Sequence, residues 1–134
     1  MTTHATGSFE VKLSPQAPQE KADGVTLGRL SIDKQFHGDL AASSTGEMLT
    51  AASDGNGSAA YVAVERVTGT LHGRSGTFVL LHTGTMTRDA QHLSVTVAAD
   101  SGTAQLVGLA GTMVITIVDK KHLYDFEYTL AQRP

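Results

Sequence analysis

The sequence contains no cysteine and no tryptophan, and only three of its 134 residues are proline. Without cysteine, the chain can form no disulfide, no thiolate metal site and no cysteine nucleophile. Charged residues make up 17% of the chain, against about 25% in an average soluble domain. Fourteen glycines and many threonines take their place. This composition favours strands and tight turns over long helices, because β-branched side chains pack well on a pleated sheet and glycine suits turns.

Strong charge of one sign and long apolar runs are also missing. The net charge is −3 and the densest basic run is Lys120-Lys121-His122, so the chain lacks the basic face by which proteins bind nucleic acid. No apolar run approaches the roughly 20 residues of a membrane span. The first residues lack the basic and apolar regions of a signal peptide. We therefore expect a cytoplasmic protein with no nucleic-acid or membrane partner, folded as one domain over residues 1–134.

Alternating apolar and polar residues predict an all-β fold. The strands are expected at residues 5–13, 26–37, 40–50, 59–71, 77–86, 91–99, 112–118 and 122–130. Most connections are short, so neighbouring strands should pair in an antiparallel meander. Strands of this length tend to coil and close on themselves, and glycines inside them fit that coiling. We predict a closed eight-stranded antiparallel barrel and keep a two-sheet sandwich as the alternative.

The fourth and fifth predicted strands carry one carboxylate and one imidazole that can meet. Glu65 and His82 each share a face with mainly apolar residues of their strand. A turn at Gly73-Arg74 places the two directly opposite each other, and a longer turn places His82 opposite Val67 and diagonal to Glu65. In an apolar lumen such a pair predicts acid–base catalysis. The alternatives are a structural polar pair, or reversed faces with Glu65 on the surface.

Large apolar and aromatic side chains on the same faces are candidates for binding a ligand. They lie on the fourth, fifth and last predicted strands: Tyr61, Phe78, Met86, Tyr124, Phe126 and Tyr128. Such residues first serve as packing elements, but they can also line a cavity, with tyrosine hydroxyls as polar contacts. Whether the lumen is packed or hollow is left open by the sequence.

The remaining polar residues give weaker indications. The six histidines show neither a His-x-His pair nor a helical spacing, so we expect no metal site and no other cofactor. Asp33, Lys34 and Asp39 are interpreted as surface charges or turn formers. Leu30, Ile32 and Phe36 share one face, which forms an apolar outer patch suited to a subunit interface if the polar face of that strand turns inward.

Several stretches resemble a bacterial family of small proteins, the domain-of-unknown-function family 3224. They include residues 36–40, 46–49, 100–103 and 124–128, and above all YVAVERVTGTLHGRSGTFVLLHTGTM at 61–86. The resemblance covers nearly the whole chain. It implies a barrel similar to that of allene oxide cyclase, a fold whose members work as oligomers and guide cyclisation or coupling of small hydrophobic molecules. No cyclase active-site motif maps onto this chain, so activity is implied only by analogy of fold.

Three functions follow from these observations. The first is a barrel that binds a small apolar molecule in its lumen and assists isomerisation or cyclisation without a cofactor, through Glu65, His82 and a tyrosine. The second is a non-catalytic carrier with the same cavity. The third is a structural module with a packed lumen. In each case we expect a homo-oligomer.

Overall fold

The computed structural model describes residues 2–16, 19–55 and 57–130, and nearly all of these form antiparallel strands. The elements in chain order are β1 (Thr3–Pro15), β2 (Glu20–Ala22), β3 (Val25–Gly38), β4 (Leu40–Ser53), β5 (Ala59–Leu71), β6 (Arg74–Met86), β7 (Gln91–Val97), the short 3₁₀ helix η1 (Ala104–Leu106), β8 (Ala110–Val118) and β9 (Lys121–Thr129). Among the described residues, no helix has the length and apolar character needed to cross a bilayer.

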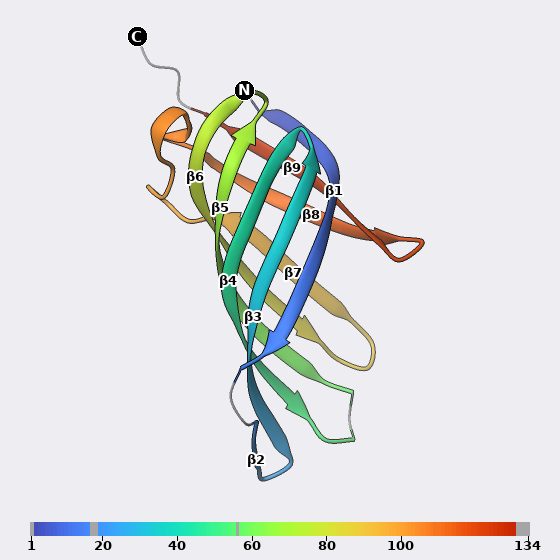
Figure 1. Cartoon of the computed structure of the whole chain (residues 1–134). Helices are drawn as coiled ribbons and strands as arrows, with labels where there is room; N and C mark the ends of the chain where they lie inside the picture. Colours follow the sequence, from blue (N-terminus) through green and yellow to red (C-terminus); the bar gives the residue numbers. More distant parts are fainter. Residues whose placement is uncertain (1, 17–18, 56, 131–134) are drawn as a thin grey trace.

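The strands form a closed antiparallel barrel of eight. Neighbours follow the order β1-β9-β8-β7-β6-β5-β4-β3, and β1 pairs with β3 to close the ring. Figure 1 shows the long strands coiling around one axis. The predicted barrel is therefore confirmed and the two-sheet sandwich is wrong. The short β2, which was not predicted, pairs with the first three residues of β3.

Turn residues that tolerate positive φ set the hairpins. His72 and Gly73 join β5 to β6 with φ of 48° and 80°, and Asp119 and Lys120 join β8 to β9 with φ of 49° and 67°. Two-residue turns with this handedness match the right-handed twist of paired strands. The predicted strand at 112–118 begins earlier, at Ala110, and the connection before it contains η1 rather than strand.

Burial alternates along the strands and settles which face lies inside. On β5, Ala63, Glu65 and Val67 are buried, whereas Val64 and Arg66 between them are exposed. The same alternation holds on β6, β3 and β9. The polar face of β3 does not turn inward, because Ile32 and Phe36 are both 3% exposed. The alternative in which these two residues form an outer patch is therefore wrong.

The apolar core fills one end of the barrel. Phe78 and Phe126 stack with their centroids 5.9 Å apart, and Tyr128 stacks on Phe126 at 5.3 Å. The Tyr124 hydroxyl accepts a hydrogen bond from the Leu40 amide and lies within hydrogen-bond distance of nearby carbonyls. Together with aliphatic residues from β4–β8 and η1, these rings form one cluster. Buried side chains line this end of the lumen.

The tip of the β8–β9 hairpin departs from the barrel wall. β7 and β8 are joined at a single position, Thr96 opposite Thr112. On the other side, pairing between β9 and β1 ends at Phe9 opposite His122. Beyond this fork β1 continues along β3, while the tip of the hairpin projects outward (Figure 1). The wall is thus open on both sides of the hairpin tip.

Candidate functional site: a buried polar cluster in the barrel

Four polar side chains meet in the middle of the barrel. They come from four strands: Lys34 on β3, Ser44 on β4, Glu65 on β5 and His82 on β6. Glu65 has no exposed surface, and Ser44, His82 and Lys34 are 1%, 5% and 6% exposed. Buried charges are costly unless they are paired and hydrogen-bonded. The contacts of the Glu65 carboxylate therefore decide the character of the site.

Three donors converge on the Glu65 carboxylate. The Lys34 ammonium donates to Oε2 over 2.8 Å, and the Ser44 hydroxyl donates to Oε1 over 2.6 Å. The His82 Nε2 atom forms a hydrogen bond with Oε2. Both carboxylate oxygens are therefore satisfied. This is the arrangement that allows an ionised carboxylate to persist in a protein interior.

These contacts keep Glu65 ionised. Burial alone raises the pKa of its carboxyl group, but the hydrogen bond from His82 and the positive charge of Lys34 outweigh it and lower the pKa from 4.5 to about 2. An ionised carboxylate can only accept hydrogen bonds. The proton in the bond between His82 and Glu65 therefore sits on Nε2, and a neutral His82 ring presents an unprotonated Nδ1.

The second ring nitrogen of His82 takes no part in the cluster. Nδ1 of His82 has no hydrogen-bond partner among the described residues. Among all the residues that the structure describes, the Ser53 hydroxyl is the only fully buried side-chain polar atom without a hydrogen-bond partner. Nδ1 is not among these fully buried atoms, and His82 as a whole is 5% exposed. A carboxylate that orients an imidazole, with the other ring nitrogen open, is the arrangement of a general base.

The register between β5 and β6 differs from both predicted registers. Glu65 lies opposite Leu80, and His82 lies opposite Ala63, because the two-residue turn is His72-Gly73, one position earlier in the chain than the shorter predicted turn, Gly73-Arg74. His82 therefore reaches Glu65 diagonally, from the side opposite to the predicted diagonal. Diagonal neighbours in an antiparallel pair remain within reach of long side chains, so the shift preserves the contact.

Sequence reasoning missed two members of the cluster. Lys34 was interpreted as a surface charge, and that interpretation is wrong, because the side chain is buried against Glu65. A signal was present: Lys34 stands between Ile32 and Phe36 on an apolar face. Ser44 gave no such signal, since β4 is rich in small residues. The predicted turn and surface role of Asp39 is correct, and its carboxylate accepts a bond from the Thr6 amide.

Aromatic rings cover the Lys34 ammonium on its other side. Its nitrogen lies 4.8 Å from the centroid of Phe9 and 5.8 Å from that of Phe36. Ring faces attract a cation within about 6 Å. Lys34 is thus held between a carboxylate and two aromatic rings, which fixes its charge on the Glu65 side of the lumen.

A small cavity opens at the end of the barrel opposite the aromatic core. Its volume is about 200 Å³, and its walls include Met48, Tyr61, Gly84 and Met86. Tyr61 and Gly84 lie opposite each other, one inward-facing position outside Ala63 and His82. Burial and, secondarily, the Glu65 charge raise the pKa of the Tyr61 hydroxyl. The four residues of the polar cluster do not line the cavity, and the nearest inward-facing pair to its walls is Ala63 and His82.

The predicted site residues thus divide into three groups. Glu65 and His82 are hydrogen-bonded in the lumen. Tyr61 and Met86 line the mouth cavity. Phe78, Phe126, Tyr124 and Tyr128 belong to the packed core at the other end. The last four pack in the buried core, and a ligand-binding role for any of the six stays a prediction.

Comparison with known proteins supports the resemblance found in the sequence. The model of the family described as "Protein of unknown function (DUF3224)" matches residues 5–128. The chain belongs to the DUF3224 family. A crystal structure of a DUF3224 protein of unknown function from Shewanella oneidensis MR-1 is 45% identical, with a TM-score of 0.92 over 98% of this chain and 100% of that one. Comparison with curated proteins gave no match.

DUF3224 membership establishes the fold but carries no activity to this chain. The likeness to allene oxide cyclase stays a prediction. Within the part of the chain that the structure describes, no three His, Asp or Glu residues form a group that could hold a metal ion. The chemistry open to this DUF3224 protein is therefore argued from the polar cluster and the mouth cavity alone.

Proposed function

We propose that this DUF3224 barrel binds a small apolar molecule at its mouth and moves a proton within it, as a cofactor-independent isomerase. The observation that carries the proposal is the open Nδ1 of His82, whose Nε2–H is bound to the ionised Glu65. A neutral imidazole oriented in this way can remove a proton from an activated C–H group. Glu65 then stabilises the imidazolium.

The remaining members of the site support this assignment. Lys34 and Ser44 occupy both oxygens of Glu65, so the carboxylate cannot rotate away from His82. The proton that His82 takes from one carbon of the ligand is returned to another carbon, which leaves the enzyme unchanged. The mouth volume of about 200 Å³ is below the roughly 300–1,000 Å³ of pockets for drug-sized ligands, so the ligand is small.

A β,γ-unsaturated cyclohexenone is a suitable probe, because its activated C–H and small ring match the site. We expect conversion to the conjugated isomer, followed by ultraviolet absorbance, with deuterium incorporated in deuterium oxide. His82→Gln and Glu65→Gln should each lower the rate at least about 100-fold, the lower end for loss of a general base. Circular dichroism checks that each variant is folded.

The control is His37→Asn, which removes an exposed histidine outside the cluster and should leave the rate unchanged. Equal rates for wild type and His82→Gln would contradict the proposal. Binding of the probe by all variants with no turnover by any of them would favour the carrier function instead.

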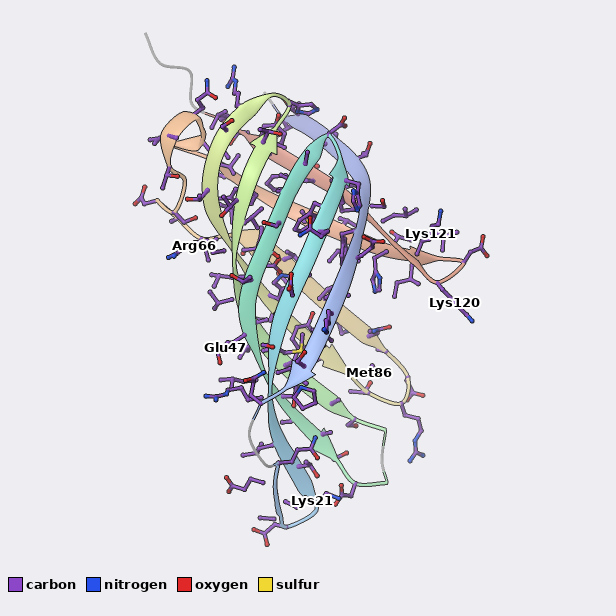
Figure 2. All side chains as sticks on the ribbon, viewed as in Figure 1. Lys21, Glu47, Arg66, Met86, Lys120 and Lys121 are labelled. Atoms are coloured by element: carbon purple, nitrogen blue, oxygen red, sulfur yellow. The ribbon has the colours of Figure 1, made fainter. Side chains whose placement is uncertain are left out.

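We also propose that the protein assembles with a second copy of itself through the outer face of β3–β6. Five apolar side chains there are 42–55% exposed: Leu27, Leu49, Val62, Val64 and Leu81. Leu49 lies opposite Val62, and Val64 opposite Leu81, so the patch is continuous. Glu47 and Arg66 lie on the same outer face (Figure 2), and the Glu47 carboxylate pairs with Arg29 of its own chain over 3.5 Å.

Val64→Asp should convert the assembly to a monomer, because it buries a carboxylate in an apolar contact. Size-exclusion chromatography with light scattering measures the change. The matched control is Val114→Asp on β8, where the valine is 63% exposed but lies outside the patch. A wild-type protein that is monomeric at high concentration would contradict this assembly.

A further inference from the structure

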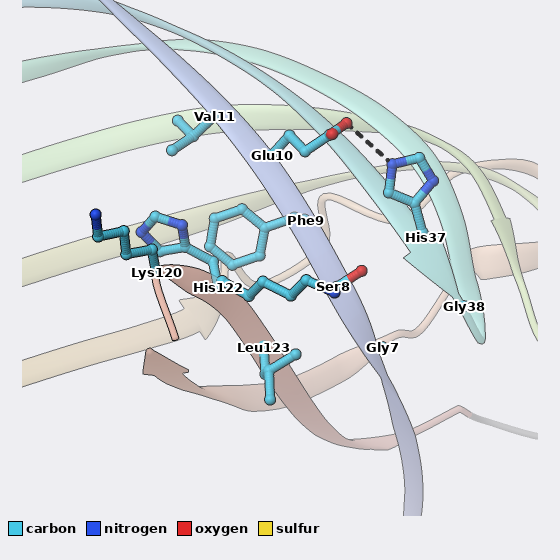
Figure 3. Close-up of a pocket in the computed structure, with 11 residues that line it drawn as sticks. Gly7, Ser8, Phe9, Glu10, Val11, His37, Gly38, Lys120, His122 and Leu123 are labelled. Atoms are coloured by element: carbon cyan, nitrogen blue, oxygen red, sulfur yellow. Dashed lines mark hydrogen bonds and ion pairs between the residues drawn. The ribbon is translucent and has the colours of Figure 1, made fainter. Parts of the chain in front are cut away.

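A second and larger depression lies at the fork where the β8–β9 hairpin leaves β1. Its volume is about 850 Å³, and its walls come from residues 7–11 of β1, the end of β3 and residues 120–123. The fork exists because β9 stops pairing with β1 at Phe9 and His122. Figure 3 shows these two rings and Lys120 gathered along one stretch of it. None of the four residues of the buried cluster lines this groove.

The groove has an aromatic floor. The half-buried His122 ring stacks on Phe9, with centroids 4.9 Å apart and an interplanar angle of 29°. Phe9 is in turn held from the inside by Lys34, 4.8 Å from its centroid. A flat ring fixed at the base of an open groove offers a stacking surface to a planar ligand.

The groove also carries an excess of positive charge. Lys120 and Lys121 are exposed and line it. The one carboxylate in the lining, Glu10, lies 3.2 Å from the ring of His37, which holds it on the β3 side (Figure 3). Two ammonium groups beside apolar Phe9, Val11 and Leu123 suit a ligand with a flat apolar body and an anionic group better than a purely ionic one.

We infer that this groove is a binding site for small planar aromatic acids. The ring of the ligand stacks on His122, and its carboxylate pairs with Lys120 and Lys121. The site is separate from the mouth cavity, since the two share no lining residue. The inference therefore goes beyond the proposed isomerase activity and does not depend on it.

The test is a fluorescence titration with naphthoate and with its neutral amide, naphthamide. The chain has no tryptophan, so naphthalene emission is read without overlapping tryptophan emission. We expect naphthoate to bind more tightly than naphthamide. Replacing both lysines, as Lys120→Asn with Lys121→Gln, should weaken naphthoate about five- to tenfold, the size expected for two solvent-exposed charges, and leave naphthamide unchanged. Asn suits position 120, where φ is 67°, because it tolerates left-handed backbone.

Three further variants complete the test. His122→Leu should weaken both probes, because it removes the stacking ring, and Glu10→Gln should strengthen naphthoate only. Lys21→Gln is the matched control, since Lys21 lies on β2 far from the hairpin tip (Figure 2). His82→Gln should leave naphthoate binding intact, which separates this site from the proposed active site.

Equal affinity for acid and amide, or no effect of the double lysine variant, would overturn the inference. So would competition by acetate at the same concentration as naphthoate, because it would show that stacking contributes nothing. Loss of naphthoate binding in His82→Gln, with the lysine variant unaffected, would place the probe in the lumen and likewise contradict the site.

Discussion

Lys34→Met should lower the free energy of unfolding by about 3 kcal/mol, the lower end for removing one partner of a buried ion pair. The change leaves the fully buried Glu65 carboxylate with Ser44 and His82 but without its ammonium partner. A buried charge that loses its counter-charge retains the whole cost of leaving water. Urea unfolding at neutral pH, followed by circular dichroism, measures the loss.

Two further variants show whether this loss comes from the ion pair. Lys12→Met removes an exposed lysine of β1 and should change stability by less than about 0.5 kcal/mol. Adding Glu65→Leu to Lys34→Met removes both charges and should recover most of the stability, since apolar residues of similar volume often replace a buried pair without cost. A double variant as unstable as the sum of the two single variants would contradict the pairing.

Acid should destabilise the wild-type barrel through Glu65 in particular. Its pKa falls from 4.5 to about 2 on folding, because the hydrogen bond from His82 and the charge of Lys34 outweigh the effect of burial. A carboxyl group with a lowered folded-state pKa contributes stability that is fully present above its unfolded pKa. That contribution is lost as the pH falls through the folded-state value. For this difference in pKa it amounts to about 3 kcal/mol, at about 1.4 kcal/mol per pH unit.

The measurement is the urea midpoint between pH 5 and pH 2, compared with that of the Lys34→Met, Glu65→Leu double variant. All other carboxylates are common to the two proteins, so the difference between the two profiles isolates Glu65. We expect wild type to lose about 3 kcal/mol more than the double variant over this range. Parallel profiles would mean that Glu65 is not held as an ionised group.

The candidate active site was predicted only in part, for reasons that lie in the geometry of sheets. The period of two correctly grouped Glu65 with Val67, and His82 with Leu80. It could not give the register, because that depended on which two residues form the β5–β6 turn. Lys34 and Ser44 come from strands that the chain reaches about 20 to 30 positions before Glu65, and no local pattern links them to it.

The sequence by itself determined the number and approximate bounds of the barrel strands, their antiparallel order and which side chains share a face. These properties follow from alternation and from turn residues, which act over a few neighbouring positions. Tertiary structure alone decided which face is inside, which end of the lumen is packed and which is open, and that four strands bring their polar groups to one carboxylate. It also decided the fork beside Phe9. Closure of the ring sets these features, because it fixes register and spacing between residues that are distant in the chain.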